Sequence, residues 1–321
     1  MRTFSKISIT MLVSFVIAII GIQLVNAQTA LTTVNLGTAE SFAVLAGTEI
    51  TNIPTSIITG DVGLSPASGS NYAGLTAEEV TGTIYSVDAS GPAGSVNNPD
   101  LLTQAKNDLT TAYLDAAGRT PTQTFTDVDN QLGGQTLTSG VYAFGNATTA
   151  NITAESPLIL DAQGDPNAVF IFQASSDLVT ASGSEVRLIN GAQSCYVFWQ
   201  VTSSATLGTG STFVGTIMAL TSISATTDVT VYGRLLARNA AVTLDSDTIT
   251  SEICVASATT TTTTDTSTDT TAKLPGTNGT TLSTKGITWN IVILVLAGIS
   301  TLLLVLSRRE TMFSSRTSKE R

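Results

Sequence analysis

The sequence predicts a mainly β protein, a β-solenoid with parallel strands and one long α-helix packed beside it. Three segments that start at Tyr196, Val214 and Tyr232 align at a constant offset of 18 residues. Each holds short β-prone runs separated by Gly, Ser, Thr or Asn. A coil of this length cannot bury its apolar face alone, so it must stack on its neighbours. A β-sandwich also shows short strands at regular spacing, but the constant offset favours the solenoid.

The repeat also predicts which positions share a register. Trp199, Ile217 and Leu235 occupy one register position. Gly215 and Gly233 match at an expected corner. Earlier coils are less regular, and their candidate segments are Phe42–Asn52, Ser56–Leu64, Gly140–Phe144, Pro157–Leu160 and Val169–Ala174.

One helix is predicted between the strands, over about residues 99–117. Asn98 is a good N-cap, Pro99 suits the first helical position and Asp100 favours the positive end of the helix dipole. Gly118 closes the segment. Apolar residues recur at helical spacing at Leu101, Leu102, Ala105, Leu109, Ala112, Tyr113 and Ala116. We expect this amphipathic helix to lie along the solenoid and to cover one of its faces.

The two ends of the chain are predicted not to belong to this solenoid. Residues 1–27 combine Arg2 and Lys6 with an apolar run and small residues up to Ala27, which is typical of a signal peptide. An uncleaved anchor helix is the alternative. Residues 288–307 form an apolar stretch long enough to span a bilayer, and the basic tail 308–321 is expected on the cytoplasmic side. These signals place the domain 28–256 outside the cell. A buried core helix is the alternative for 288–307, although no domain follows to bury it.

Residues 257–287 are predicted to form an extended stalk. Ten of the fourteen residues from Ala258 to Thr271 are Thr, and such a segment cannot bury enough surface to fold. The stalk contains Leu274-Pro-Gly-Thr277-Asn278, which resembles the Leu-Pro-x-Thr-Gly sorting signal of Gram-positive surface proteins. That resemblance implies sortase cleavage after Thr277 and attachment to the cell wall. Asn278 stands where the signal has Gly, so retention of the membrane helix is the alternative.

The two cysteines, Cys195 and Cys254, lie near the start of the regular coils and at the end of the domain. An even pair outside the cell favours a disulfide. Two buried free thiols are the alternative. A disulfide would tie the C-terminal segment to a position about three coils earlier.

The composition excludes several functional classes. The chain has no His, which removes His-based triads and His-ligated metal sites. Residues 28–287 hold 7 basic and 22 acidic residues, a net charge of −15. This acidic domain is unsuited to nucleic acid, whose phosphates need clustered Lys and Arg.

Several longer motifs resemble the large microbial ice-binding protein family. They are Phe42-Ala-Val-Leu-Ala-Gly47, Thr59-Gly-Asp-Val-Gly-Leu-Ser-Pro66, Val197-Phe-Trp-Gln200, Ser204-Ala-Thr-Leu-Gly208, Phe213-Val-Gly-Thr-Ile-Met-Ala-Leu220 and Gly233-Arg-Leu-Leu-Ala-Arg238. The resemblance covers residues 30–256. It implies a right-handed β-helix of triangular section with a long helix beside it, and ice binding through one flat face. Some members carry Thr-(Ala/Gly)-x-(Thr/Asn) on that face, and the segment Thr209-Gly-Ser211-Thr212 matches this pattern.

Ice binding requires a flat, rigid face that orders water in a lattice. Stacked coils repeat about every 4.8 Å, and Thr offers a hydroxyl and a methyl on one restricted torsion. The second strand of each regular coil fits, because its apolar residues alternate with small uncharged ones. Its predicted outward residues are Ser204, Thr206, Ser222, Ser224, Thr226, Ala241, Thr243 and Asp245. Thr48 and Thr51 are expected to extend this face.

The sequence therefore predicts a non-enzymatic, cofactor-free domain at the cell surface that binds the surface of an ice crystal. Three alternatives remain open from the residues themselves. Ser and Thr fill any solvated β face; the fold also suits an adhesin for a glycan or another cell; and paired carboxylates permit a carbohydrate-active enzyme without His. Two sets of residues are weak Ca²⁺ candidates, namely Asp127, Asp129 and Asn130, and Asp245 with Asp247. Both sets are better interpreted as solvated turn residues.

Overall fold

The computed structural model describes residues 31–126, 131–145 and 149–254. All of them belong to one compact unit, Met1–Thr259, and a second unit, Thr260–Arg321, lies outside the described residues. The predicted signal peptide, stalk, sorting motif, membrane helix and tail therefore also lie outside them. Among the described residues, no helix is both long and apolar enough to cross a membrane.

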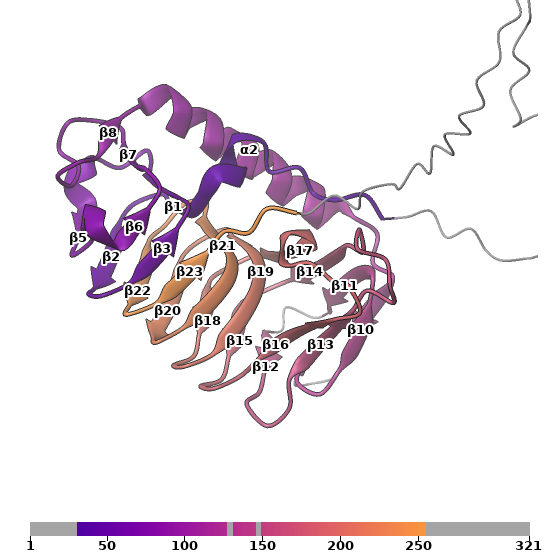
Figure 1. Ribbon diagram of the computed structural model, residues 1–321. Coiled ribbons are helices and arrows are strands. Elements are labelled where there is room, and N and C mark those ends of the chain that lie inside the picture. Colours follow the sequence, from indigo (N-terminus) through magenta and orange to yellow (C-terminus); the bar gives the residue numbers. More distant parts are fainter. Residues whose placement is uncertain (1–30, 127–130, 146–148, 255–321) are drawn as a thin grey trace, which may run out of the picture. The chain divides into compact units, whose positions relative to one another are not determined.

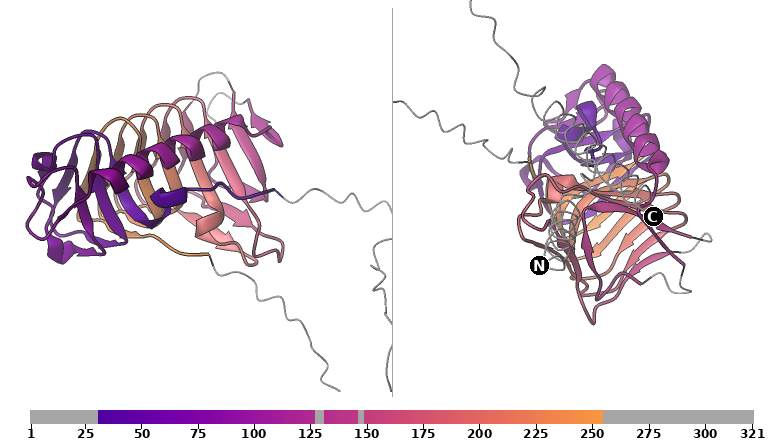
Figure 2. Two further views of the ribbon diagram at one scale, coloured as in Figure 1. Left: turned by 90° about the horizontal axis from the view of Figure 1, so that it is seen from above. Right: turned by 90° about the vertical axis from the view of Figure 1, so that its right-hand side faces the viewer.

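The described domain is a β-solenoid with three faces, and every strand pair in it is parallel (Figure 1). We name the first the helix face, because the long helix α2 (Pro99–Gly118) lies along it (Figure 2). Its strands, in spatial order, are β9 (Gln123–Phe125), β11 (Gly140–Phe144), β14 (Phe170–Ala174), β17 (Val197–Val201), the second halves of β19 (Thr212–Ala219) and β21 (Thr230–Ala237), β1 (Phe42–Ala46), β4 (Asp61–Leu64), β7 (Ile84–Ser86) and β8 (Val96–Asn97).

The other two faces follow it around each coil. The flat face consists of β12 (Ala150–Ile152), β15 (Leu178–Thr180), β18 (Ala205–Leu207), β20 (Ile223–Thr227), β22 (Val242–Asp245), β2 (Ile50–Ile53) and β5 (Tyr72–Ala73). The third face consists of β10 (Thr136–Thr138), β13 (Leu158–Asp161), β16 (Val186–Ile189), the first halves of β19 and β21, β23 (Thr248–Thr250), β3 (Ile57–Thr59) and β6 (Val80–Thr81). Four short 3-10 turns complete the domain: η1 (Gly37–Ser41), η2 (Gly69–Asn71), η3 (Ala77–Glu79) and η4 (Ser194–Tyr196).

The 18-residue repeat is confirmed as one coil of this solenoid. Trp199 pairs with Ile217, which pairs in turn with Leu235. Gly215 and Gly233 lie at the bend where β19 and β21 pass from the third face to the helix face. Gly233 has a φ of 155°, and a Cβ there would come within 1.9 Å of the Gly215 carbonyl oxygen. Only glycine permits this close stacking of corners.

The coils do not stack in the order of the sequence. The N-terminal coil, which begins with β1, pairs with β21 of the last coil. From there the chain proceeds to one end of the stack, and α2 returns it along the helix face to the other end (Figure 2). The remaining coils then build back toward β1. We call the junction between the last and first coils the seam; it crosses all three faces, at the pairs β1–β21, β2–β22 and β3–β23.

The interior of the solenoid contains a stack of aromatic rings. Phe172 lies parallel to Trp199 with 3.9 Å between ring centroids, and Phe213 lies tilted against the same indole at 5.1 Å. Tyr142 continues the stack from Phe172 at 5.4 Å. The Trp199 Nε1–H donates to the Val214 carbonyl at 3.0 Å, so this fully buried polar atom is satisfied.

The predicted amphipathic helix is confirmed, and both its apolar side and its polar flanks hold it in place. The Asn98 side chain caps it by accepting from the Leu101 N–H at 3.2 Å. Lys106 Nζ donates to the Ala237 and Arg238 carbonyls at 2.8 and 2.6 Å. Burial lowers the pKa of Lys106 to about 7, and the charge of Arg238 adds to that effect. The buried apolar residues are Leu102, Ala105, Leu109, Ala112, Tyr113 and Ala116.

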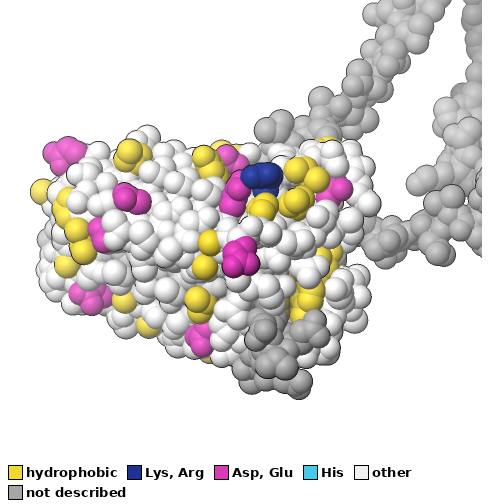
Figure 3. All heavy atoms as spheres, turned by 90° about the horizontal axis from the view of Figure 1, so that it is seen from below, with side chains coloured by type: hydrophobic (Ala, Val, Ile, Leu, Met, Phe, Trp, Pro, Cys, Tyr) yellow, Lys and Arg dark blue, Asp and Glu magenta, His cyan; other side chains and the backbone are white. Residues whose placement is uncertain are grey.

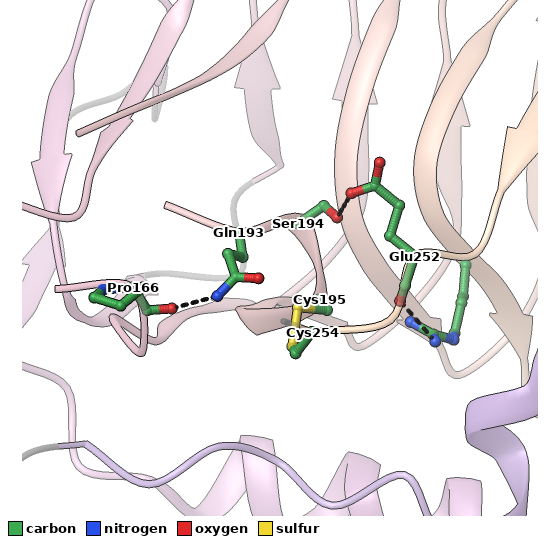
Figure 4. The surroundings of a disulfide bond; sticks show 7 residues. Pro166, Gln193, Ser194, Cys195, Glu252 and Cys254 are labelled. Atoms are coloured by element: carbon green, nitrogen blue, oxygen red, sulfur yellow. Dashed lines mark hydrogen bonds between the residues drawn. A yellow bond between two sulfur atoms is a disulfide. The ribbon is translucent and has the colours of Figure 1, made fainter. Parts of the chain in front are cut away.

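The predicted disulfide between Cys195 and Cys254 is present (Figure 4). Cys195 belongs to η4, which lies between the third face and the helix face. The bond therefore ties Cys254, in the segment that follows β23, to that edge. Beside it, the Ser194 hydroxyl donates to the Glu252 carboxylate, and Gln193 donates to the Pro166 carbonyl at 2.7 Å.

Replacing both cysteines by serine is expected to lower the free energy of unfolding by about 2–4 kcal/mol, because the crosslink closes a long loop and restricts the unfolded chain. The loop joins residues separated by 59 positions. Urea unfolding of the parent and of Cys195→Ser/Cys254→Ser measures the difference. Reductant should lower the midpoint of the parent and leave that of the variant unchanged. Equal midpoints for oxidised parent and variant would contradict this expectation.

Candidate functional site

The flat face presents one continuous outward row that crosses the seam. The row runs Asn151, Val179, Thr206, Ser224, Thr243, Thr51 and Ala73, each paired in register with the next. We call these seven residues the central row. Their side chains are all small or medium in size and uncharged. Parallel coils repeat about every 4.8 Å, so the row is a regular line of such groups along the whole stack.

Except at Ala73, both strand neighbours of each central-row residue are buried in the core. On β18, Ala205 and Leu207 are fully buried while Thr206 is exposed, and on β22 Val242 and Leu244 bracket Thr243 in the same way. This is the period-two alternation of a strand with one buried face. Figure 3 shows the side of the molecule opposite α2, where most of the surface is backbone or uncharged polar side chain, and Lys or Arg appears at one place.

Hydroxyl groups beside the central row bond to one another between coils. Ser204 Oγ lies 2.9 Å from Ser222 Oγ and 2.6 Å from Thr221 Oγ1. On the other side of the row, Thr226 donates to the Leu207 carbonyl at 2.8 Å. These bonds restrict the side-chain torsions of Ser204, Ser222 and Thr226, which flank the row.

The structure brings most of the predicted residues together and separates four of them. Thr51, Thr206, Ser224 and Thr243 lie in the central row, as predicted. Ser222, Thr226 and Asp245 flank it, and Asp245 accepts from the Thr227 hydroxyl at 2.7 Å. Thr48 and Thr209 lie at corners instead, outside the strands of the flat face.

Two residues of the matched Thr-Gly-Ser-Thr pattern do not lie on the flat face. Ser211 is 1% exposed and points inward, so its assignment to a binding surface is wrong. Thr212 begins β19 and pairs with Thr230 on the third face. The physical reason is that the chain turns the corner between Thr209 and Thr212, which divides the four residues between two faces.

Sequence reasoning missed three members of the central row, namely Asn151, Val179 and Ala73. The offset from Asn151 to Val179 is 28 residues and from Val179 to Thr206 is 27, because these coils carry longer turns than the 18-residue coils. The alternation around Asn151, between Ala150 and Ile152, is the signal that would have identified it.

The larger surface cavities of the described part of the domain lie away from the flat face. Three surface cavities of about 680, 380 and 240 Å³ all lie against the segment around Gly37, and no central-row residue lines any of them. Within residues 31–126, 131–145 and 149–254, no group of three or more Asp, Glu, Cys or His side chains is placed to hold a metal ion. The candidate Asp127, Asp129 and Asn130 lie outside the described residues.

Asp247, the other Ca²⁺ candidate, serves the corner next to the flat face. Its carboxylate is fully buried and accepts from the Val229 and Asp245 N–H groups at 2.8 and 2.9 Å. Burial raises the pKa of Asp247 to about 6, although these two hydrogen bonds favour the ionised form. Asp247 therefore acts as a turn residue, as predicted, but it is buried and not solvated as the sequence analysis expects.

This raised pKa makes the stability of the domain depend on pH. The folded carboxyl keeps a proton that the unfolded chain releases above 3.8, so its contribution to stability is complete below that pKa and is lost as the pH rises through about 6. Relative to the parent, the free energy of unfolding of Asp247→Asn should thus rise by about 2 kcal/mol between about pH 4 and pH 7. Urea unfolding of both proteins at the two pH values measures this change. If the difference in free energy of unfolding between the two proteins is the same at both pH values, the expectation is wrong. This holds however much the substitution itself changes the stability.

Comparison with known proteins agrees with this architecture. The model of the ice-binding-like family matches residues 44–250. An ice-binding protein of Flavobacterium frigoris (strain PS1) is 41% identical over 217 residues, which cover 68% of this chain and 76% of that protein. An ice-binding protein of Nostoc sp. (strain HG1) is 44% identical over 217 residues, which cover 67% of this chain and 73% of that protein.

Solved structures show the same relationship. An ice-binding protein from an Antarctic biological consortium superposes with a TM-score of 0.61 at 39% identity, covering 70% of this chain and 93% of that one. An ice-binding protein from an Arctic yeast superposes with a TM-score of 0.62 at 31% identity, covering 70% of this chain and 96% of that one. Its structure was described as the basis for the antifreeze activity of that protein. This chain therefore belongs to the ice-binding-like family.

Proposed function

We propose that this domain binds ice through its flat face and that it does so without catalysis. The observation that carries this proposal is the central row, an uncharged line of side chains in unbroken register over seven strands. The relatives named above are ice-binding proteins, which supports the same conclusion.

The geometry of the row suits a crystalline ligand. Coils repeat about every 4.8 Å along the stack, and alternate residues on one strand are about 6.6 Å apart, so the face offers a two-dimensional lattice of groups. Thr side chains present both a methyl and a hydroxyl with one strongly restricted torsion. Rigid small groups lose little entropy when they meet a surface, whereas long charged side chains would lose much more.

We further propose that the domain is displayed at the cell surface. The supporting observations are in the sequence: the signal-peptide pattern of residues 1–27, the Thr-rich stalk 257–287, the apolar stretch 288–307 and the basic tail 308–321. The membrane, through that stretch, or the cell wall, through a sortase acting after Thr277, would hold the protein. A tethered domain suits adhesion to ice or modification of ice around the cell.

Single ice crystals grown with the domain test the proposed ligand. The similarity covers 93% and 96% of the chains of the two solved relatives, so a domain of this size folds on its own. The experiment can therefore use residues 28–256. We expect faceted crystals or arrested growth, while buffer and a non-binding protein at equal concentration leave crystals round. If the domain is folded and the crystals nevertheless stay round, ice is not the ligand. That outcome would favour an adhesin for a glycan or another cell.

A further inference from the structure

A buried chain of hydrogen bonds crosses the seam at the corner between the flat face and the third face. The Asp247 N–H donates to Ser56 Oγ at 3.0 Å, and the Ser56 hydroxyl donates to Asn52 Oδ1 at 2.7 Å. Asn52 Nδ2 and the Ser56 N–H then both donate to Glu79 Oε1 at 2.8 Å. The other Glu79 oxygen accepts from the N–H and hydroxyl of Thr76 at 2.9 and 3.0 Å. All but Thr76 are buried.

This network links four successive coils that the sequence places far apart. Asp247 reaches back to Val229 in the coil before the last, at 2.8 Å. Ser56 and Asn52 belong to the first coil, and Glu79 belongs to the next one, beyond the seam. Asp247 and Ser56 are separated by 191 positions in the sequence. No short covalent connection fixes one half of the stack against the other here, so non-covalent contacts must do it.

Burial of one face excludes a slip of one residue between strands, but a slip of two residues keeps the same faces buried and needs another constraint. A fully satisfied buried polar network is specific, since any slip leaves donors and acceptors unpaired at a cost of about 1–3 kcal/mol each. The central row crosses the seam between Thr243 and Thr51. Asn52 follows Thr51 directly on β2, and Asp247 lies two positions after the end of β22. A slip at the seam would therefore break the lattice of the flat face.

We infer that the hydrogen-bond chain Asp247–Ser56–Asn52–Glu79 positions the two halves of the flat face on one common lattice, so that Thr51 and Ala73 add to ice binding by the other five residues of the central row. This inference rests on the proposed function of that face. The four residues are positioning residues, because they are buried and do not touch the ligand.

Ser56→Ala removes the central link with little change in volume. Its matched control is Ser211→Ala, which removes a hydroxyl that is as deeply buried as that of Ser56 and lies at the same corner of another coil. Ser211 Oγ lies 3.5 Å from Thr180 Oγ1, and these two residues belong to coils that follow one another directly in the chain. Ice affinity and crystal shape are measured on full-length protein below the unfolding temperature of each variant. We expect the ice affinity of Ser56→Ala to fall about tenfold, because a site displaced by about 1 Å loses most of its function. Ser211→Ala should bind ice as tightly as the parent.

A second substitution separates positioning from general destabilisation. In the parent, Thr51→Tyr and Thr206→Tyr should each reduce ice binding. In the Ser56→Ala background, Thr51→Tyr should have no further effect, while Thr206→Tyr removes the remaining activity. Merely reduced stability would leave Thr51→Tyr as damaging as in the parent, and that result would overturn the inference.

Hydrogen exchange tests the seam independently of ice. The amides of β2 and β22 should exchange faster in Ser56→Ala than in the parent, and those of β18 and β20 should not. Protected seam amides in Ser56→Ala would also overturn the inference. If the parent does not shape ice, the proposed function fails, but the exchange rates still decide whether this network holds the seam.

Discussion

Thr206→Tyr/Ser224→Tyr is expected to abolish ice shaping, with growth rates around crystals returning to those of buffer. The two residues are paired neighbours near the middle of the central row. Each phenol ring would project beyond the short side chains around it and hold the rest of the face away from a planar ligand. Because ice binding depends on many contacts made together, two such obstacles remove most of the contact area. The measurement is crystal growth and thermal hysteresis for parent and variant at equal concentration.

The matched control for this experiment is Thr212→Tyr/Thr230→Tyr. These two threonines are also paired neighbours on adjacent coils, but they lie on the third face, and their pairing does not cross the seam. The same chemical change is thus made on a different surface. Ice shaping should persist in this control. Loss of activity in the control together with retention in Thr206→Tyr/Ser224→Tyr would move the binding surface to the third face.

Trp199→Ala is expected to lower the free energy of unfolding by about 5 kcal/mol. Removing a buried Trp side chain costs about 3–5 kcal/mol through lost burial and the cavity that remains. The variant also leaves the buried Val214 carbonyl without its Nε1–H donor and interrupts the aromatic stack between Phe172 and Phe213. Guanidinium unfolding monitored by circular dichroism measures the change.

Two further variants assign this loss to its causes. Trp199→Phe keeps an aromatic ring in the stack but removes the N–H donor, so it should cost clearly less than Trp199→Ala. Leu114→Ala provides the comparison for an exposed apolar residue, since the Leu114 side chain is 60% exposed on α2. Its cost should be within about 0.5 kcal/mol of zero. A similar small value for Trp199→Ala would show that the stack does not carry the stability of the solenoid.

Local chemistry in the sequence was sufficient to predict the repeating elements. The period of the regular coils followed from three segments whose apolar residues recur at one offset, and the structure pairs Trp199 with Ile217 in the predicted register. The N-cap and the apolar pattern of α2 depend on neighbours within one turn, so they too were readable. The pairing of Cys195 with Cys254 followed from there being only two cysteines in a chain whose N-terminal pattern predicts export.

The residues of the flat face were predicted only in part, because membership of a face depends on where each corner falls. Thr206, Ser224 and Thr243 lie in 18-residue coils, where the offset gives the register directly. Asn151 and Val179 belong to longer coils, whose turns shift the register by an amount that sequence spacing does not show. Ser211 appeared to belong to a surface motif, but the turn between the flat and third faces directs it inward.

By itself, the sequence determined the class of fold, the repeating coil, the long helix and the uncharged character of the outward strands, because each depends on residues close together in the chain. Only the tertiary structure decided the order in which the coils stack and the position of the seam. Pairing between β1 and β21 joins residues nearly two hundred positions apart, and its free energy comes from packing and hydrogen bonds that form only after folding. For the same reason, the partners of Asp247 and Ser56 were not visible in the sequence.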